Sequence, residues 1–399
     1  MNTFCQANGQ ATVHAGDLVC LVPNLGFPPA KNGPDPIAGL TAAIASQANL
    51  VPLASPASGI IYNTDPSLQI LVPSGTESFG PVLSERGETL RRHKAFVAFS
   101  YQRFGFNSID RVSLKAIPAV FLASVQGQPR ATAFEETSTR VDLTVNQFAL
   151  YATYGLTDRI DVSVAVPILN VRIGANSNCN AAIIFNGTGT PRCNFQLSNG
   201  TLTNYVQNFR QATGLGDVVF RIKGALFEGE HLRLAAGLDV RVPSGNELNF
   251  LGTGAAGLRP FLVGSLRGRV SPHVGLAYQW NGHSDIASIQ GPGVSAKLPD
   301  NFSYAIGMDA RVVKRLTLSG DILGEVLRDA LREAVETQPV TGFTGVATGV
   351  GSYNTNYASI GGKLNPAGNL LVTLNVLLKL DHYGLRNKPA PLIGLSYTF

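Results

Sequence analysis

The sequence predicts an all-β protein, a transmembrane antiparallel β-barrel, and three observations lead to that prediction. Many segments alternate apolar and polar residues with a period of two, and their apolar faces carry no charge. The connections between these segments alternate between short and long. The last strand runs to the chain end, where Ile393, Leu395, Tyr397 and Phe399 share one face. Short turns on one rim, long loops on the other and an apolar outer face are typical of outer-membrane barrels.

The composition agrees with a barrel but does not select it alone. Of the 399 residues, 14% are charged, whereas a typical soluble domain has roughly 25%. The 43 glycines favour tight turns over long helices. No run of about 18 apolar residues is present that could form a spanning helix. The net charge is +5 and the basic residues are dispersed, which argues against a nucleic-acid partner.

The chain divides into an N-terminal segment and the barrel. Residues 1–75 are expected to form a plug or to line the lumen, and residues 76–399 to form the barrel. Residues 36–53 are apolar and rich in alanine, which is compatible with a short helix. A barrel of about fourteen strands has a lumen that side chains alone cannot fill, so it has room for such a segment.

Thirteen strands are expected from the alternation, and most are about 10 to 13 residues long, close to what a tilted membrane strand needs. Single-chain bacterial barrels have an even number of strands, so a fourteenth is expected within residues 58–74; twelve strands are the alternative. A change of phase at Asn146 and Gln147 is interpreted as a β-bulge. The thirteen expected strands are 94–106, 112–123, 139–155, 158–172, 215–227, 231–243, 259–270, 272–282, 301–312, 314–325, 354–364, 369–380 and 389–399.

Long connections are expected on the outer rim, at residues 174–213, 243–258, 283–300 and 326–353. Within the last of these, residues 324–339 space their apolar side chains like an amphipathic helix. Such a helix would either cap the pore or simply pack on the strands.

Charged residues on the polar strand faces are the candidate functional residues. One interpretation treats them as mutually neutralising ion pairs, and another holds that they set the field that a permeating solute meets. The two interpretations are compatible. The residues expected to face the lumen are Arg221, Lys223, Arg233, Asp239, Arg241, Asp309, Arg311, Arg315 and Asp321.

The four cysteines fall into two close pairs, Cys5 with Cys20 and Cys179 with Cys193. Neither pair has the Cys-x-x-Cys spacing of zinc or redox sites. The pattern therefore favours two local disulfides formed in an oxidising compartment, with free thiols as the alternative. No signal peptide is recognisable at the start of the sequence, which we interpret as a mature form or a mis-assigned start.

No catalytic residue, metal site or cofactor site is expected. Residues 252–257 spell G-x-G-x-x-G, but a strand follows them where a dinucleotide site needs a helix, so we interpret them as a flexible loop. The six histidines are scattered without metal spacing. His273 lies near Ser271, but at an expected periplasmic turn and not as a nucleophile–base pair in a cleft.

Several motifs at turns and strand starts are familiar from one group of proteins. They are residues 78–90, 99–104, 154–161, 214–223, 239–245, 250–254 and 271–278. On these motifs, from about residue 50 to its end, the chain resembles the outer-membrane transporter family associated with meta-pathway phenol degradation. That resemblance implies a barrel and carries over no catalytic residue; such proteins are similar in plan to barrels that admit fatty acids and aromatic hydrocarbons.

The sequence therefore predicts a channel of the Gram-negative outer membrane for passive uptake of small, apolar or aromatic molecules, and not an enzyme. Expected partners are membrane lipid, the solute, and the barrel-assembly machinery, which would read Tyr397 and Phe399. The alternative is a structural or adhesive surface barrel whose disulfide-bearing loop, residues 173–214, binds a partner. The solute and the oligomeric state stay open.

Overall fold

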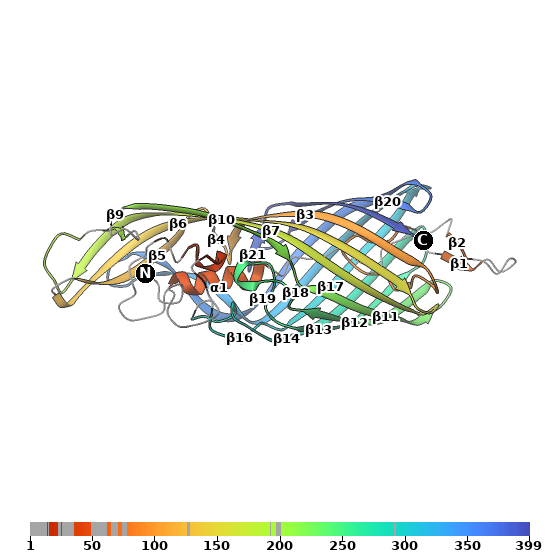
Figure 1. Ribbon diagram of the computed structural model, residues 1–399, viewed down its shortest axis with the longest axis horizontal. Coiled ribbons are helices and arrows are strands. Elements are labelled where there is room, and N and C mark those ends of the chain that lie inside the picture. The colour runs from red at the N-terminus through yellow and green to blue at the C-terminus, as the bar shows by residue number, and fades with distance from the viewer. Residues whose placement is uncertain are drawn as a thin grey trace.

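Twelve of the described strands close into an antiparallel barrel in this computed structural model (Figure 1). The structure describes residues 14, 16–22, 25, 36–48, 62–64, 71–73, 78–125, 128–191, 193–196, 201–290 and 293–399. Around the barrel the strands are β3 (Ala95–Ile109), β6 (Gln128–Gly155), β7 (Ile160–Phe185), β11 (Val218–Glu228), β12 (Leu232–Val242), β13 (Gly257–Leu266), β14 (Val270–Asn281), β17 (Asn301–Val313), β18 (Leu316–Thr337), β19 (Thr344–Ala367), β20 (Leu370–Lys379) and β22 (Ala390–Thr398).

The barrel closes where its last strand meets its first. In β22, Tyr397 pairs with Val97 of β3, and the Phe399 amide donates to the Ala95 carbonyl at 2.7 Å. Residues along β22 alternate strictly between buried and exposed. Ile393, at 48% exposed, and Phe399, at 60%, point outward. The strand that ends the sequence is therefore a barrel strand with one apolar outer face, as predicted.

Four further strands extend the sheet without belonging to the closed circle. They are β4 (Val112–Ser113), β5 (Ile117–Val125), β10 (Tyr205–Leu215) and β21 (Leu385–Asn387). The remaining short elements are η2 (Leu18–Cys20), η4 (Glu247–Asn249), β8 (Phe195–Gln196), β9 (Leu202–Thr203), β15 (His283–Ser284) and β16 (Ala296–Lys297).

The expectation of fourteen strands is wrong, and the alternative of twelve is confirmed. The expected strand 112–123 corresponds to β5, which pairs only with β6 and lies outside the circle. The strand expected within 58–74 is instead a separate two-stranded sheet, β1 (Tyr62–Thr64) with β2 (Leu71–Pro73), near the end of the molecule that holds the C-terminus (Figure 1). Strands of three residues are far too short to cross a bilayer.

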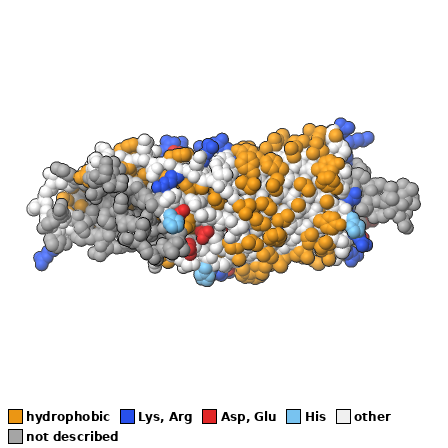
Figure 2. Space-filling view, in the orientation of Figure 1, with side chains coloured by type: hydrophobic (Ala, Val, Ile, Leu, Met, Phe, Trp, Pro, Cys, Tyr) orange, Lys and Arg blue, Asp and Glu red, His pale blue; other side chains and the backbone are white. Residues whose placement is uncertain are grey.

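An apolar belt surrounds the half of the barrel nearest the C-terminus. Figure 2 shows hydrophobic side chains covering this half on the visible face, with basic side chains at its rim. Ile306 and Leu374, at 58% and 59% exposed, are typical of the belt. Within the belt, the outward positions of β11 to β14, β17 to β20 and β22 carry no charged side chain. Such a surface is stable against lipid hydrocarbon and not against water. Among the described residues, no helix is long and apolar enough to cross a bilayer.

Beyond the belt, the apolar faces of the longest strands turn inward. In β6, Phe148 and Leu150 point outward, whereas Val141 and Val145 are buried inside. The pairing of β6 with its neighbours is regular at Asn146, so the bulge expected there is absent. The alternation of apolar and polar residues changes phase because the surroundings of the strand change. The outer half of the barrel has water outside and a packed interior.

That interior is formed with helix α1 (Pro36–Ala48), which lies within the outer half of the molecule (Figure 1). Its side chains from Ala38 to Ala48 are buried, and Leu40 and Ile44 belong to the same core as Val141 and Val171 of the wall. Gln47 donates to the Leu331 carbonyl at 3.1 Å and accepts from the Leu385 amide at 2.6 Å. A helix that is apolar on all sides requires such an enclosure.

Two expected loops are strands instead. Most of residues 174–213 belongs to β7 and β10, which pair with each other, and residues 326–353 belong mainly to β18 and β19. The helix expected at 324–339 is absent, because these residues continue β18 to Thr337. A register shift between Leu327 and Ala330 moves the inward face and gives the apolar residues a helix-like spacing.

Candidate functional site

A segment that precedes the first barrel strand lies inside the barrel. It closes the half of the barrel nearest the C-terminus, which we call the lower half. This lumen segment, residues 78–90, is buried almost throughout. The Phe79 amide donates to Thr317 at 3.0 Å, and the Leu90 amide donates to Asp161 at 2.8 Å. Buried Lys363 donates to the Phe79 carbonyl at 3.2 Å. The bonds come from opposite sides of the wall and therefore fix the segment across the lumen near the turns that connect the barrel strands.

The side chain of Ser84 ties the middle of the lumen segment to the wall. Its Oγ lies 2.8 Å from Nε2 of His273 and 2.8 Å from Oδ1 of Asp321. Nε2 of His273 lies closer still to Asp321, at 2.6 Å, and Nδ1 lies 3.2 Å from Asp309. With a carboxylate at each ring nitrogen, the histidine donates twice and has no lone pair to accept the serine proton. Ser84, His273 and Asp321 have the composition of a catalytic triad, but here they hold the lumen segment to the wall. We call these three residues the clamp.

Above the clamp, a row of alternating charges crosses three neighbouring strands. Arg221 of β11, Asp239 of β12 and Arg259 of β13 stand opposite one another in register. Arg221 forms two bonds to Asp239, at 2.6 and 2.8 Å, and Arg259 contacts the same carboxylate at 3.2 Å. Glu85 of the lumen segment lies 3.1 Å from Arg221 and 3.3 Å from Lys223. The row therefore joins the lumen segment to the wall by ion pairs.

The charge row forms one side of a cavity of about 310 Å³ in the barrel lumen. The lumen segment contributes Leu83, Ser84 and Glu85 to this cavity. Much of the remaining wall is apolar, including Phe261, over which the Arg221 guanidinium stacks at 4.7 Å from the ring centre. A volume of about 300 Å³ lies at the small end of pockets that hold small molecules.

The outer side of the cavity is covered by the loop between β12 and β13. Leu251, Gly252 and Thr253 of this loop line the cavity. Asp217 holds the loop by accepting from the Gly245 amide at 3.1 Å and from the Thr253 amide at 2.8 Å. The G-x-G-x-x-G sequence at 252–257 therefore lies in a loop that covers the lumen, and the Asp217 carboxylate holds this loop in place.

The structure brings together most of the residues expected to face the lumen. Arg221, Asp239 and Arg241 line the cavity. The buried side chains of Lys223, Arg233, Asp309 and Asp321 lie on the same inner face, nearer the strand-connecting turns. Half-buried Arg311 lies with its guanidinium 5.6 Å from the Phe79 ring, close to the rim. Arg315 is exposed in the turn between β17 and β18 and does not join the group.

Four charged residues at the cavity were not among those predicted, and they are Glu85, Asp217, Arg259 and Glu325. Arg259 begins a predicted strand and continues its alternation, so the signal was present. Glu325 keeps the inward parity of Asp321 along β18, but the predicted helix at 324–339 concealed it. Glu85 comes from outside any barrel strand, and only the fold brings it beside Arg221.

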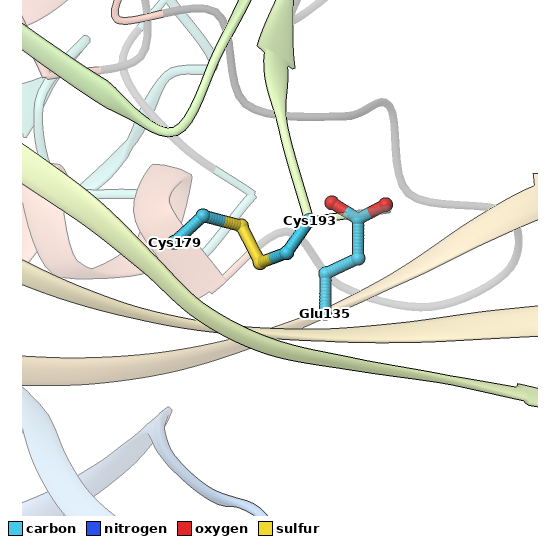
Figure 3. Close-up of side chains that lie close together, drawn as sticks. All are labelled: Glu135, Cys179 and Cys193. Carbon is cyan, nitrogen blue, oxygen red and sulfur yellow. A yellow bond between two sulfur atoms is a disulfide. The ribbon is translucent and has the colours of Figure 1, made fainter. Parts of the chain in front are cut away.

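Cys179 and Cys193 form a disulfide at the outer end of the molecule, with their Cα atoms 5.4 Å apart. Glu135 of β6 lies beside the two sulfur atoms, as Figure 3 shows. Burial raises the pKa of the Glu135 carboxyl to about 7. A disulfide leaves no thiolate to bind a metal ion, so this cluster is a covalent tie. Cys20 is buried, whereas Cys5 lies outside the described residues, so that pair stays a prediction.

A closed barrel with an uncharged apolar belt and a polar, partly filled lumen is the architecture of outer-membrane proteins. The protein is a barrel of the bacterial outer membrane. No protein-family model matches the chain, and no curated protein matches it.

Three solved structures with a similar arrangement are distant from this chain. An outer membrane channel from Pseudomonas putida F1 has 13% identity and a TM-score of 0.48 over 78% of this chain and 98% of that one. A Pseudomonas aeruginosa FadL homologue has 9% identity and a TM-score of 0.34, over 86% and 96%. The P. putida toluene transporter TodX has 10% identity and a TM-score of 0.33, over 77% and 89%. At this distance no residue role is transferred from them.

Proposed function

We propose that the protein is a passive channel by which small, apolar or aromatic molecules cross the outer membrane. The observation that carries the proposal is the lumen cavity of about 310 Å³, which combines apolar walls with a few fixed polar groups. Ligand sites in proteins commonly have this character. The motifs that resemble the phenol-degradation transporter family agree with an aromatic solute.

The segments that fill the lumen have distinct roles in this proposal. Helix α1 of the N-terminal segment forms a plug for the outer half, whereas β1 and β2 of that segment lie at the opposite end, and the lumen segment closes the lower half. The charged residues hold the lumen segment and also set the field around the cavity. Because the polar bonds of the lumen segment lie beside the cavity, an entering solute can compete for them.

Solute flux into liposomes tests the proposal directly. Vesicles containing the purified protein should admit toluene or phenol faster than protein-free vesicles, and a sugar of larger volume should not follow. Planar-bilayer conductance gives an independent measure of opening. A barrel that neither conducts nor raises the flux of any small solute would refute the channel.

The alternative of a surface adhesin keeps one supporting observation. The disulfide cross-links the outer end of β7 to residue 193, which gives this region a fixed shape. Deleting residues 186–204 should leave solute flux unchanged under our proposal. Lost cell adhesion with unchanged flux would instead favour the adhesive function.

We also propose that Tyr397 and Phe399 are read by the barrel-assembly machinery. The two rings pack edge-on, with centres 4.7 Å apart, on the outer face of the strand that closes the barrel. They are therefore accessible from outside along the seam between β22 and β3.

A further inference from the structure

One carboxylate at the lumen cavity differs from the others in having no hydrogen-bond or ion-pair partner among the described residues. Glu325 lies on the inward face of β18, in register between Ser303 of β17 and Thr355 of β19. It lines the cavity. Its carboxylate makes no hydrogen bond or ion pair with any residue that the structure describes.

The other three carboxylates at the cavity are each held by a cation. Glu85 lies 3.3 Å from Lys223, Asp239 lies 2.6 Å from Arg221, and Asp217 lies 3.7 Å from Arg241. These groups have their hydrogen-bonding capacity largely satisfied by the protein. Glu325 is the acceptor that stays open to the cavity.

Two arginines, Arg259 and Arg386, attract Glu325, but neither donates a hydrogen bond to it. The Arg386 guanidinium lies 2.8 Å from Asp381. The Arg259 guanidinium donates to Asp239 at 3.2 Å and to Ser303 at 3.1 Å. The charge row therefore ends at Ser303, one strand before Glu325. A carboxylate away from bulk water is costly unless a donor reaches it.

Apolar side chains lie around this acceptor. Leu323 precedes Glu325 on the same inward face, and Phe261 and Val263 contribute to the same cavity. A molecule that fills the cavity would therefore meet apolar surface over most of its body and one strong acceptor.

We propose that Glu325 is a specificity-determining residue that accepts a hydrogen bond from the solute. The cavity then selects small molecules with an apolar or aromatic body and one donor group, a hydroxyl or an ammonium. It disfavours carboxylates of the same size, because like charges repel and neither group can donate. This inference deepens the proposed function and rests on it only in requiring that a solute enters the cavity.

Binding, measured apart from transport, tests the inference. The probes are 4-fluorobenzyl alcohol, 4-fluorobenzylamine, 4-fluorotoluene and 4-fluorobenzoate, followed by fluorine NMR on protein in nanodiscs, with empty nanodiscs as the baseline. The alcohol and the amine should bind about tenfold more tightly than the toluene, since hydrogen bonds to charged groups are the stronger class. The benzoate should bind most weakly.

Two variants separate the acceptor from the shape of the cavity. Glu325→Leu should remove the preference for the alcohol and the amine while keeping the affinity for the toluene. Glu325→Gln keeps an acceptor without the charge, so it should weaken the amine more than the alcohol. The matched control is Glu336→Gln, the same change on an exposed residue farther along β18.

The outcomes distinguish this inference from the proposed function. A preference for donor solutes that disappears in Glu325→Leu supports the inference, even if liposomes show no flux and the channel proposal fails. Equal binding of the alcohol and the toluene in the wild type overturns it, as does a preference that survives both variants. Resistance of the folded barrel to unfolding in sodium dodecyl sulfate shows for each variant that the barrel has formed.

Discussion

Removing the carboxylate of Glu85 should release the lumen segment from the barrel wall. Glu85 forms ion pairs with two residues of the wall, Arg221 and Lys223. In Glu85→Leu, Arg221 keeps Asp239, and the Lys223 ammonium, which is 1% exposed, keeps the Arg86 carbonyl at 3.2 Å and the electrostatic attraction of Asp161, its partner in register on β7. The variant therefore removes from a buried cation the carboxylate that contacts it.

The magnitude follows from this burial. Breaking a buried ion pair by removing one partner costs about 3–5 kcal/mol. Glu85 is 14% exposed and opens to the cavity, so we expect a smaller cost than this, about 2–3 kcal/mol. A free-energy change of that size shifts the equilibrium between the bound and the released lumen segment by about 30- to 150-fold.

Two measurements check this prediction, with a double variant as its control. Hydrogen exchange at the Phe79, Gly87 and Leu90 amides, which all bond to the wall, should accelerate by that factor. Liposome flux should rise with it. The double variant Glu85→Leu with Lys223→Met also removes the buried cation that has lost its contact with Glu85, and should restore most of the protection. Unchanged exchange and flux in a folded Glu85→Leu barrel would refute the role of these ion pairs.

Three further predictions concern the terminus, the plug and the outer extension. Phe399→Glu places a charge where a 60% exposed ring faces the belt, so outer-membrane levels should fall several-fold, and normal levels would count against an assembly signal. Ile44→Ala removes a 2% exposed side chain from α1 and should cost about 2–4 kcal/mol, seen as faster proteolysis of the N-terminal segment with the barrel intact; unchanged proteolysis would contradict the plug packing. Burial raises the pKa of Glu333, in the part of β18 beyond the membrane, from 4.5 to about 8, so the stability of this region should fall as pH rises between these values. Thermal unfolding at pH 5 and pH 9 measures this difference, which Glu333→Gln should abolish; an equal difference in that variant would assign it to other groups.

The sequence predicts the membrane half of the barrel well, because each strand there separates the same two environments along its whole length. Lipid lies outside and a polar lumen inside, so Phe220 and Ile222 alternate with Arg221 and Lys223 in a simple period of two. The prediction fails in the outer half, where water lies outside the barrel and the apolar, packed environment lies inside it. Val141 and Val145 are apolar because they belong to the buried core that also includes residues of α1, and the change of phase that resembles a bulge marks the outer border of the membrane belt.

The predicted helix at 324–339 shows a second limit of reading the sequence alone. Leu327 and Ala330 both face inward although three positions separate them, because the strand is shifted between them and Asp329 adopts a left-handed backbone. Three is also the spacing of a helix face. Periodicity alone cannot separate a bulged strand from a helix, and here that ambiguity concealed Glu325.

The site could be predicted only in part, since its partners lie far apart along the chain. Alternation places Arg221 and Asp239 in the lumen, because each lies on a barrel strand. It gives no indication that Glu85 or Ser84 would meet them, since the lumen segment has no regular secondary structure. Its glycines and prolines predict a turn-rich connection, and the closed barrel around it supplies the partners.

The two segments inside the barrel are held by different forces, and this difference indicates which one yields to a solute. Helix α1 is held mainly by apolar packing, with Leu40 and Ile44 in the core of the outer half. A small solute offers little to replace that burial. The lumen segment is held by ion pairs and hydrogen bonds beside the cavity, and donors or acceptors on a solute can replace these one at a time. We therefore expect passage to displace the lumen segment and to leave α1 in place. Under that mechanism, cross-linking the lumen segment to the wall should stop flux, whereas cross-linking α1 to β19 should not.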